Sequence, residues 1–237
     1  MTERPINLRR HEVPGILDGR QTQLRRPVKD LIFDPYEGRP YRIRLADTDL
    51  AGDAIKIDFD SGRAHCPYGK PGDRLFGREI WMPGYEHDAD DAAGPRVSVI
   101  YRADSAEERV AAPSRDLAEQ WRRDFSEDGH TPPRWRSPIA MPRWASRILL
   151  EVTDVRVERV QDGEGETGFE SRYLAEGINR IHHGDGEHYY SALRDEPHPK
   201  NWVDPFDAWR ELWTSIHGPG SWDANPWTWV IGFRSEA

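Results

Sequence analysis

A chain of 237 residues, 36% hydrophobic and 11% aromatic, is long enough to bury the core of one large domain. Its net charge of -9 at pH 7 argues against a protein that coats nucleic acid through bulk electrostatics. The sequence has no run of about 18 apolar residues and does not begin with the apolar block of a signal peptide, which predicts a cytoplasmic protein without a membrane span. The single cysteine, Cys66, is compatible with that reducing compartment.

Basic residues are concentrated in two stretches of this acidic chain. Residues 1–44 contain 10 Arg and Lys against 6 Asp and Glu, and residues 134–147 contain four arginines and no acid. One interpretation is that these arginines pair with acidic neighbours on a solvated surface. The other is a local anion or phosphate site within an acidic surface.

In chain order, the first expected element is a short helix at residues 13–19, with Pro14 in its first turn and Gly19 after its end. Segments rich in β-branched and aromatic residues predict strands at residues 55–59, 74–82, 96–103, 146–160 and 227–233. The strand at residues 146–160 is expected to bend or bulge near Asp154. The chain therefore predicts five or six strands.

Two longer helices are expected at residues 114–125 and 205–217, where apolar residues recur at helical spacing. In the second, Asp204 is the expected N-cap and Pro205 the first helical residue, and Gly218 ends the apolar stripe. Stretches rich in Asp, Gly, Pro and Glu are expected to form surface loops at residues 84–95, 161–168 and 182–199.

Five segments in this order resemble the ASCH-domain proteins of tailed phages and prophages. They are GRQTQLRRP (19–27), CPYGKPGDRLFGREIW (66–81), MPRWASRILLEVTDVRVERVQD (141–162), LAEGI (174–178) and GSWDANPWTWVIGF (220–233). The resemblance implies one α+β domain over residues 1–237, built on a small PUA-like β-barrel of five or six strands with packed helices. It implies long loop insertions near residues 84–95, 105–135 and 161–205, and a cleft associated with RNA or modified nucleobases.

The first segment carries a signature similar to G-x-K-x-x-[E/T]-x-R. Gly19 and Arg26 match it, whereas Gln21 occupies the lysine position and Leu24 the Glu/Thr position. In a small bacterial ASCH amidohydrolase that deacylates acylated cytidines, a lysine, a threonine and a downstream glutamate are the catalytic set. The resemblance places Glu176 at the glutamate position.

These replacements bear on hydrolysis more than on binding. Leu24 offers no nucleophile and the Gln21 amide does not titrate, and we do not expect Thr22 to replace the missing nucleophile. Glu176 is therefore the one catalytic candidate that the resemblance retains.

Candidate binding residues are polar or aromatic. Gln21 can donate and accept hydrogen bonds at a nucleobase edge, and Arg25 or Arg26 can hold a phosphate, provided that they are not buried against carboxylates. Tryptophans in the resembling segments can stack on bases, or they can be barrel core. The candidate binding set is Gln21, Thr22, Arg25, Arg26, Glu79, Trp81, Trp144 and Asn225.

Three features have competing interpretations. Glu79 is either a site residue or one half of a structural ion pair, and Asn225 either contacts a base or stabilises a tight polar turn. Residues 182–188, HHGDGEH, suggest zinc but are more typical of a solvated loop. Since the chain also lacks a phosphate-loop pattern and other catalytic motifs, we expect no metal and no cofactor.

The sequence predicts a phage-type protein that binds RNA, single-stranded nucleic acid or a modified nucleoside. Two alternatives remain. One is an amidohydrolase that acts on acylated cytidine or a related nucleoside, with Glu176 as base. The other is a phage accessory protein that binds a host protein through its acidic loops.

Overall fold

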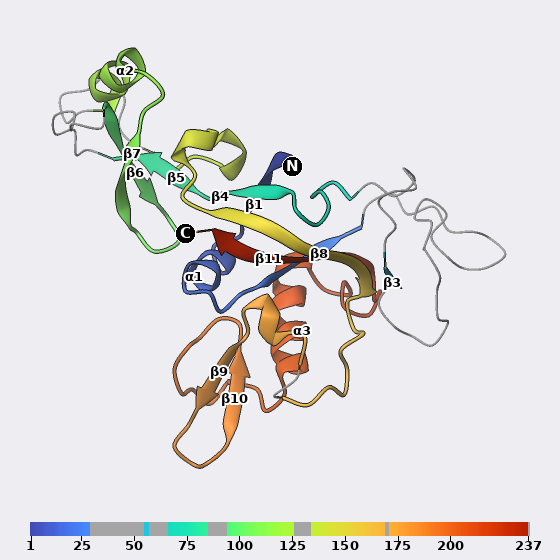
Figure 1. The fold of residues 1–237 in the computed structure, drawn as a ribbon. Helices are drawn as coiled ribbons and strands as arrows, with labels where there is room; N and C mark the ends of the chain where they lie inside the picture. The colour runs from blue at the N-terminus through green and yellow to red at the C-terminus, as the bar shows by residue number, and fades with distance from the viewer. Residues whose placement is uncertain (29–54, 57–65, 85–93, 126–133, 169–170, 237) are drawn as a thin grey trace.

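The computed structural model describes residues 1–28, 55–56, 66–84, 94–125, 134–168 and 171–236 (Figure 1). The strands are β1 (Glu3–Asn7), β2 (Gln23–Pro27), β3 (Ile55–Lys56), β4 (Arg74–Arg78), β5 (Trp81–Pro83), β6 (Arg96–Tyr101), β7 (Glu107–Ala111), β8 (Leu149–Arg159), β9 (Asn179–His182), β10 (His188–Ser191) and β11 (Trp227–Glu236). The helices are α1 (Glu12–Leu17), α2 (Arg115–Phe125) and α3 (Pro205–His217), with 3-10 turns η1 (Pro138–Ala140), η2 (Arg143–Ala145) and η3 (Leu174–Glu176). Within the described ranges, no helix combines the length and apolar character needed to cross a membrane.

The main sheet runs in the order β1-β4-β8-β11-β2, and β3 also pairs with β8. β1 and β4 are parallel, and the other pairs are antiparallel. In the long central pair, Gly232 lies opposite Asp154 while Phe233 lies opposite Val152, so Thr153 is the extra residue of a β-bulge. The predicted irregularity near Asp154 is confirmed.

The main sheet is open. Its edge strands, β1 and β2, do not pair with each other in the part of the chain that the structure describes. The Arg26 side chain lies between these edges, donating to the backbone carbonyl of Asn7 at 3.2 Å and to that of Arg25 at 2.9 Å. An α+β fold rich in strands is thus confirmed, whereas strand pairing among the described residues does not close the expected barrel.

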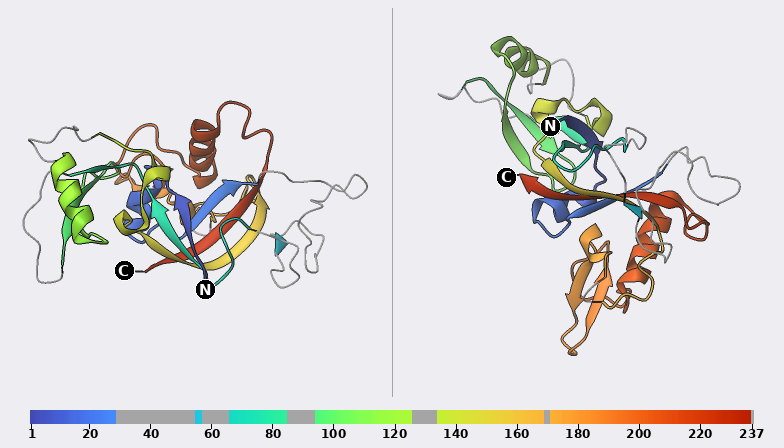
Figure 2. Two further views of the ribbon diagram at one scale, coloured as in Figure 1. Left: turned by 90° about the horizontal axis from the view of Figure 1, so that it is seen from above. Right: turned by 45° about the vertical axis from the view of Figure 1, so that its right-hand side comes forward.

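Three hydrophobic clusters stabilise the fold. The first joins the main sheet to α1, and the second joins Val160, just after β8, to residues flanking η3 and to β10 and α3. The third lies in a separate arm, where β5, β6 and β7 form a small sheet that carries α2. Figures 1 and 2 show this arm and the β9–β10 hairpin projecting from the main sheet in different directions. Cys66 is buried in the first cluster, and burial raises the pKa of its thiol to about 12.

The predicted helices are confirmed, with ends close to those expected. Gly19 follows α1 with a φ of 76°. Asp204 caps α3 by accepting a hydrogen bond from the Phe206 amide at 2.8 Å, and Pro205 is its first residue.

The strand predictions were less accurate. Residues 74–82 do not form one strand but two, β4 and β5, which belong to different sheets. The stretch 182–199 is not wholly a loop, because it contains β10. Of the strand expected at residues 55–59, residues 55–56 form β3, and residues 57–59 lie outside the described residues.

Candidate functional site

β2 is buried on both faces although it is an edge strand. Leu24 and Arg26 face α1, whereas Gln23 and Arg25 face η3 and β8, as strand alternation requires. Both arginines are almost inaccessible, with exposed fractions of 1% for Arg25 and 7% for Arg26. Two separate polar clusters therefore meet at this strand.

On the η3 face, five side chains form a closed ring of hydrogen bonds. The Gln23 amide donates to Glu176 Oε1 at 2.6 Å, and Arg25 Nε donates to the same oxygen at 2.7 Å. The far end of Arg25 donates to Glu158 at 2.6 Å. Arg156 closes the ring, donating to Glu158 and to the Gln23 carbonyl oxygen at 2.5 Å each. Two arginines balance two glutamates, so the ring is internally neutral.

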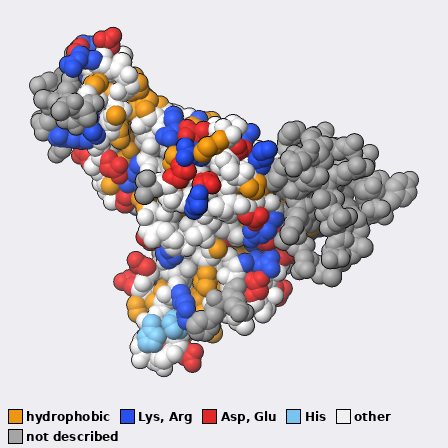
Figure 3. Space-filling view, viewed as in Figure 1, with side chains coloured by type: hydrophobic (Ala, Val, Ile, Leu, Met, Phe, Trp, Pro, Cys, Tyr) orange, Lys and Arg blue, Asp and Glu red, His pale blue; other side chains and the backbone are white. Residues whose placement is uncertain are grey.

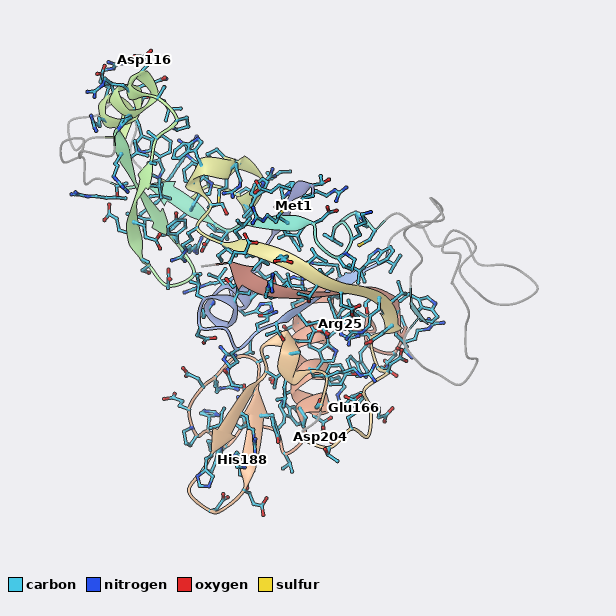
Figure 4. All side chains as sticks on the ribbon, viewed as in Figure 1. Met1, Arg25, Asp116, Glu166, His188 and Asp204 are labelled. Atoms are coloured by element: carbon cyan, nitrogen blue, oxygen red, sulfur yellow. The ribbon has the colours of Figure 1, made fainter. Side chains whose placement is uncertain are left out.

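The two carboxylates of the ring differ in acidity. Burial acts to raise the pKa of Glu158, but the charges of Arg25 and Arg156 outweigh it and lower this pKa to about 2. For Glu176, burial raises the pKa, and the opposing contributions of Arg25 and Gln23 offset only part of the shift. Figure 4 shows Arg25 below the main sheet and beside α3.

Gln21 lies two residues before Gln23 of the ring in the sequence, and its exposed fraction is 3%. Its amide nitrogen donates to the backbone carbonyl of Gln23 at 3.0 Å, which fixes the orientation of the amide because the reverse would oppose two acceptors. Its oxygen, Oε1, is buried and accepts no hydrogen bond in the described structure. A buried acceptor without a donor is costly, by about 1–3 kcal/mol, so this oxygen needs an explanation.

Two glycines and one arginine surround the Gln21 amide. A Cβ on Gly177 would lie 2.8 Å from Gln21 Oε1, and one on Gly15 would lie 3.4 Å from it. The Arg20 guanidinium donates to the Gly177 carbonyl at 2.6 Å and to Asp18 at 3.3 Å. Arg20 keeps 35% of its side chain exposed, and a Cβ on Gly15 would lie 3.4 Å from Gln21 Oε1 and 3.5 Å from a guanidinium nitrogen of Arg20, so this cation lies at the surface near the buried acceptor.

On the opposite face of β2, Arg26 forms a two-pronged ion pair with Glu12 of α1, at 2.7 and 2.9 Å. Burial opposes ionisation of Glu12, but Arg26 outweighs this effect and lowers the pKa of Glu12. The predicted phosphate role of Arg25 and Arg26 is therefore wrong: both guanidiniums are already engaged with buried carboxylates.

The remaining candidates from the first half of the chain do not join this site. Thr22 is exposed, and its backbone bonds to Ala175 and Phe233. Glu79 is 3% exposed and forms a two-pronged ion pair with Arg147 at 2.9 and 3.1 Å, which is the structural alternative. Trp81 lies in the core of the arm, and Trp144, from later in the chain, is partly buried against that core.

Trp81 is 1% exposed and stacks on Trp121 with centroids 5.8 Å apart, while Trp144 packs edge-on against the same Trp121. The expected base-stacking role of Trp81 is therefore wrong, because its ring is covered. Asn225 has a φ of 40° and accepts a hydrogen bond from the Gln161 amide, in keeping with the turn interpretation.

The histidine-rich hairpin and the α3 surface offer other polar groups. His182 and His188 are cross-strand neighbours with ring centroids 5.4 Å apart, but no group of three or more potential ligands that could hold a metal ion is found in the described ranges. An open groove of about 540 Å³ beside α3 is lined by residues that include Trp202, Glu211 and Trp222. None of the sequence-predicted site residues lines this groove.

Sequence reasoning missed four members of the buried clusters: Glu12, Gln23, Arg156 and Glu158. The alternation of Arg156 and Glu158 along β8 could have indicated that they share a face. Comparison of the chain with protein-family models, curated proteins and solved structures gives no match. The resemblance to ASCH-domain proteins therefore stays a prediction.

Proposed function

We propose that this chain is a PUA-like, ASCH-type protein of phage origin that binds RNA, single-stranded nucleic acid or a modified nucleobase. Binding takes place at Gln21 and does not involve hydrolysis. The proposal rests on one observation, the buried Gln21 oxygen that accepts no hydrogen bond in the described structure. A ligand N–H that reached this oxygen would recover the energy lost by leaving it unpaired.

The groups around Gln21 suit the edge of a nucleobase. Such an edge presents donors and acceptors side by side, and Gln21 with Arg20 presents an acceptor beside a cationic donor. Arg20 donates hydrogen bonds to the Gly177 carbonyl and to Asp18, and its side chain is partly exposed. It can therefore turn outward to admit a ligand. A base can reach a buried amide only when it is unpaired, which favours single strands and free nucleosides over duplexes.

The test is to titrate the protein with cytidine, acylated cytidine, other modified nucleosides and short oligonucleotides, following tryptophan fluorescence. Gln21→Met removes the acceptor at similar volume, and we expect it to weaken nucleoside binding about five- to ten-fold. Thr22→Ala is the matched control, since Thr22 is the exposed neighbour, and its affinity should be unchanged. Equal binding by Gln21→Met and the unmodified chain would refute the proposal.

Hydrolysis of acylated cytidine is the second candidate, favoured by the raised pKa of Glu176, a feature common in general acids and bases. Against it, Oε1 of Glu176 already accepts from Gln23 and Arg25, and Leu24 is fully buried and apolar. Chromatography of each titration mixture decides between the two candidates. Formation of free cytidine that Glu176→Gln abolishes would establish the hydrolase and displace the binding proposal.

A further inference from the structure

An exposed tryptophan projects from the segment that docks on the arm. Residue 136 forms an antiparallel bridge with Trp81 of β5, in which the Arg136 amide donates to the Trp81 carbonyl at 2.7 Å. Alternate residues of such an extended segment point in opposite directions. Arg136 accordingly lies over the Trp81 ring, with its guanidinium carbon 5.3 Å from the centroid, while Trp135 is 39% exposed.

Arginines accompany this tryptophan. The guanidinium carbon of Arg102 lies 5.5 Å from the centroid of the Trp135 ring, in a cation–π contact. The Arg102 backbone is fixed by a hydrogen bond from its amide to the Ile80 carbonyl at 2.9 Å. Arg134 precedes Trp135 and is exposed. We call Arg102, Arg134 and Trp135 the Trp135 surface.

Two carboxylates of the same arm are already occupied. Asp104, two residues after Arg102, accepts from both terminal nitrogens of Arg147, at 2.9 and 3.0 Å. Glu108 accepts from the same guanidinium at 3.0 Å. In the described structure neither Arg102 nor Arg134 forms an ion pair, so the Trp135 surface presents uncompensated positive charge beside an exposed ring.

We propose that the Trp135 surface binds single-stranded nucleic acid, with one base stacked on Trp135 and adjacent phosphates held by Arg102 and Arg134. A flat ring stacks on any base, and a planar guanidinium matches a phosphate, whereas an acidic peptide would leave the ring without a stacking partner. On the face drawn in Figure 3, the arm displays basic, acidic and hydrophobic side chains together, so the attraction is local. This inference rests on the proposed function for its class of ligand, but it names a second site.

Binding is measured by the fluorescence anisotropy of labelled ten-nucleotide single strands over a range of salt concentrations. Trp135→Ala should weaken binding about ten-fold or more, and Trp135→Phe should retain most of the affinity because it keeps a stacking ring. Arg102→Gln should reduce the slope of log affinity against log salt by about 0.7, the value for one phosphate contact on a single strand. Arg210→Gln, an exposed arginine of α3, is the matched control and should leave both quantities unchanged.

Three results would overturn the inference. They are unchanged affinity in Trp135→Ala, absence of oligonucleotide binding at low salt, and binding of polyglutamate but not oligonucleotide through Trp135, which would assign the surface to an acidic peptide. The two sites are separated by their ligands. If Trp135→Ala weakens oligonucleotide binding but Gln21→Met leaves nucleoside affinity unchanged, this inference stands and the proposed base site is refuted. If Gln21→Met weakens nucleoside binding but Trp135→Ala leaves oligonucleotide affinity unchanged, the base site stands and this inference is refuted.

Discussion

Two arginine-rich segments of this chain place the same side chain in opposite environments. Arg25, in β2, has a side chain that is 0% exposed and is held by Glu158 and Glu176. Arg134, beside β5, is exposed and forms no ion pair in the described structure. The comparison teaches that an arginine run does not define an anion site. Its environment is set by carboxylates that other elements bring to it.

Arg147 shows that membership of an arginine-rich segment does not decide whether an arginine is buried or exposed. It belongs to the second arginine-rich stretch, yet its side chain is only 8% exposed because Glu79, Asp104 and Glu108 surround it. Arg134 lies in the same stretch and forms no ion pair with any residue that the structure describes. The division is therefore between arginines that stabilise the fold and arginines that remain available to a ligand.

The largest effect is expected from Arg25→Met. Without the guanidinium, Glu158 loses one of its cationic partners, and Glu176 loses the only ion-pair partner that the described residues give it. A buried charge without its partner destabilises the fold strongly. We expect the free energy of unfolding to fall by about 3–5 kcal/mol, measured by urea denaturation. Arg234→Met, in a surface pair with Glu151, should cost about 1 kcal/mol or less. Similar losses in the two variants would contradict the structural role of Arg25.

Acid should weaken the same ring. The pKa of Glu158 is lowered from 4.5 to about 2 in the folded protein, so the folded state binds fewer protons than the unfolded one between these values. Its contribution, on the order of 3 kcal/mol, is fully present above pH 4.5 and is lost as the pH falls toward 2. Thermal unfolding from pH 5 to pH 2 checks this. The decline should be shallower in Glu158→Gln, and an unchanged decline would show that Glu158 is not the group responsible.

Much of the secondary structure could be predicted because its signals are local. The Asp204–Pro205 pair marks the start of α3, and alternating apolar residues mark β8 and β11. The break between β4 and β5 could not, because the chain changes sheets there, and that change depends on which distant strands are available for pairing.

The candidate site was predicted in part. The sequence-based candidates included Gln21, Arg25 and Glu176, which the structure brings together around β2. The sequence could not indicate that Arg25 would be neutralised, because Glu158 lies 133 residues away along the chain. Nor could it separate Trp81 from Trp135, since the burial of a tryptophan depends on what packs over it.

A smaller effect is expected from Gly177→Ala. Gly177 has a φ of 88°, which strains any other residue, and its added Cβ would lie 2.8 Å from Gln21 Oε1. Gly184 is the matched control, because its φ is 86° and a Cβ there meets nothing within 4 Å. We expect losses of about 2 and about 1 kcal/mol in the free energy of unfolding, and weaker nucleoside binding in Gly177→Ala alone. Equal losses in Gly177→Ala and Gly184→Ala would mean that the Gln21 side chain moves away from the new methyl group without a measurable cost in stability.

The smallest effect is expected from Arg134→Gln, and it tests the other half of the comparison. An exposed arginine without an ion pair contributes little to folding, so the free energy of unfolding should change by less than about 0.5 kcal/mol. Urea denaturation beside Arg25→Met gives the two values under the same conditions. A loss above about 1 kcal/mol would mean that Arg134 is engaged by the fold as Arg25 is, and the Trp135 surface would then have one cation fewer to offer a phosphate. A negligible loss in the free energy of unfolding together with weaker oligonucleotide binding is expected only of an arginine that contacts a ligand and does not stabilise the fold.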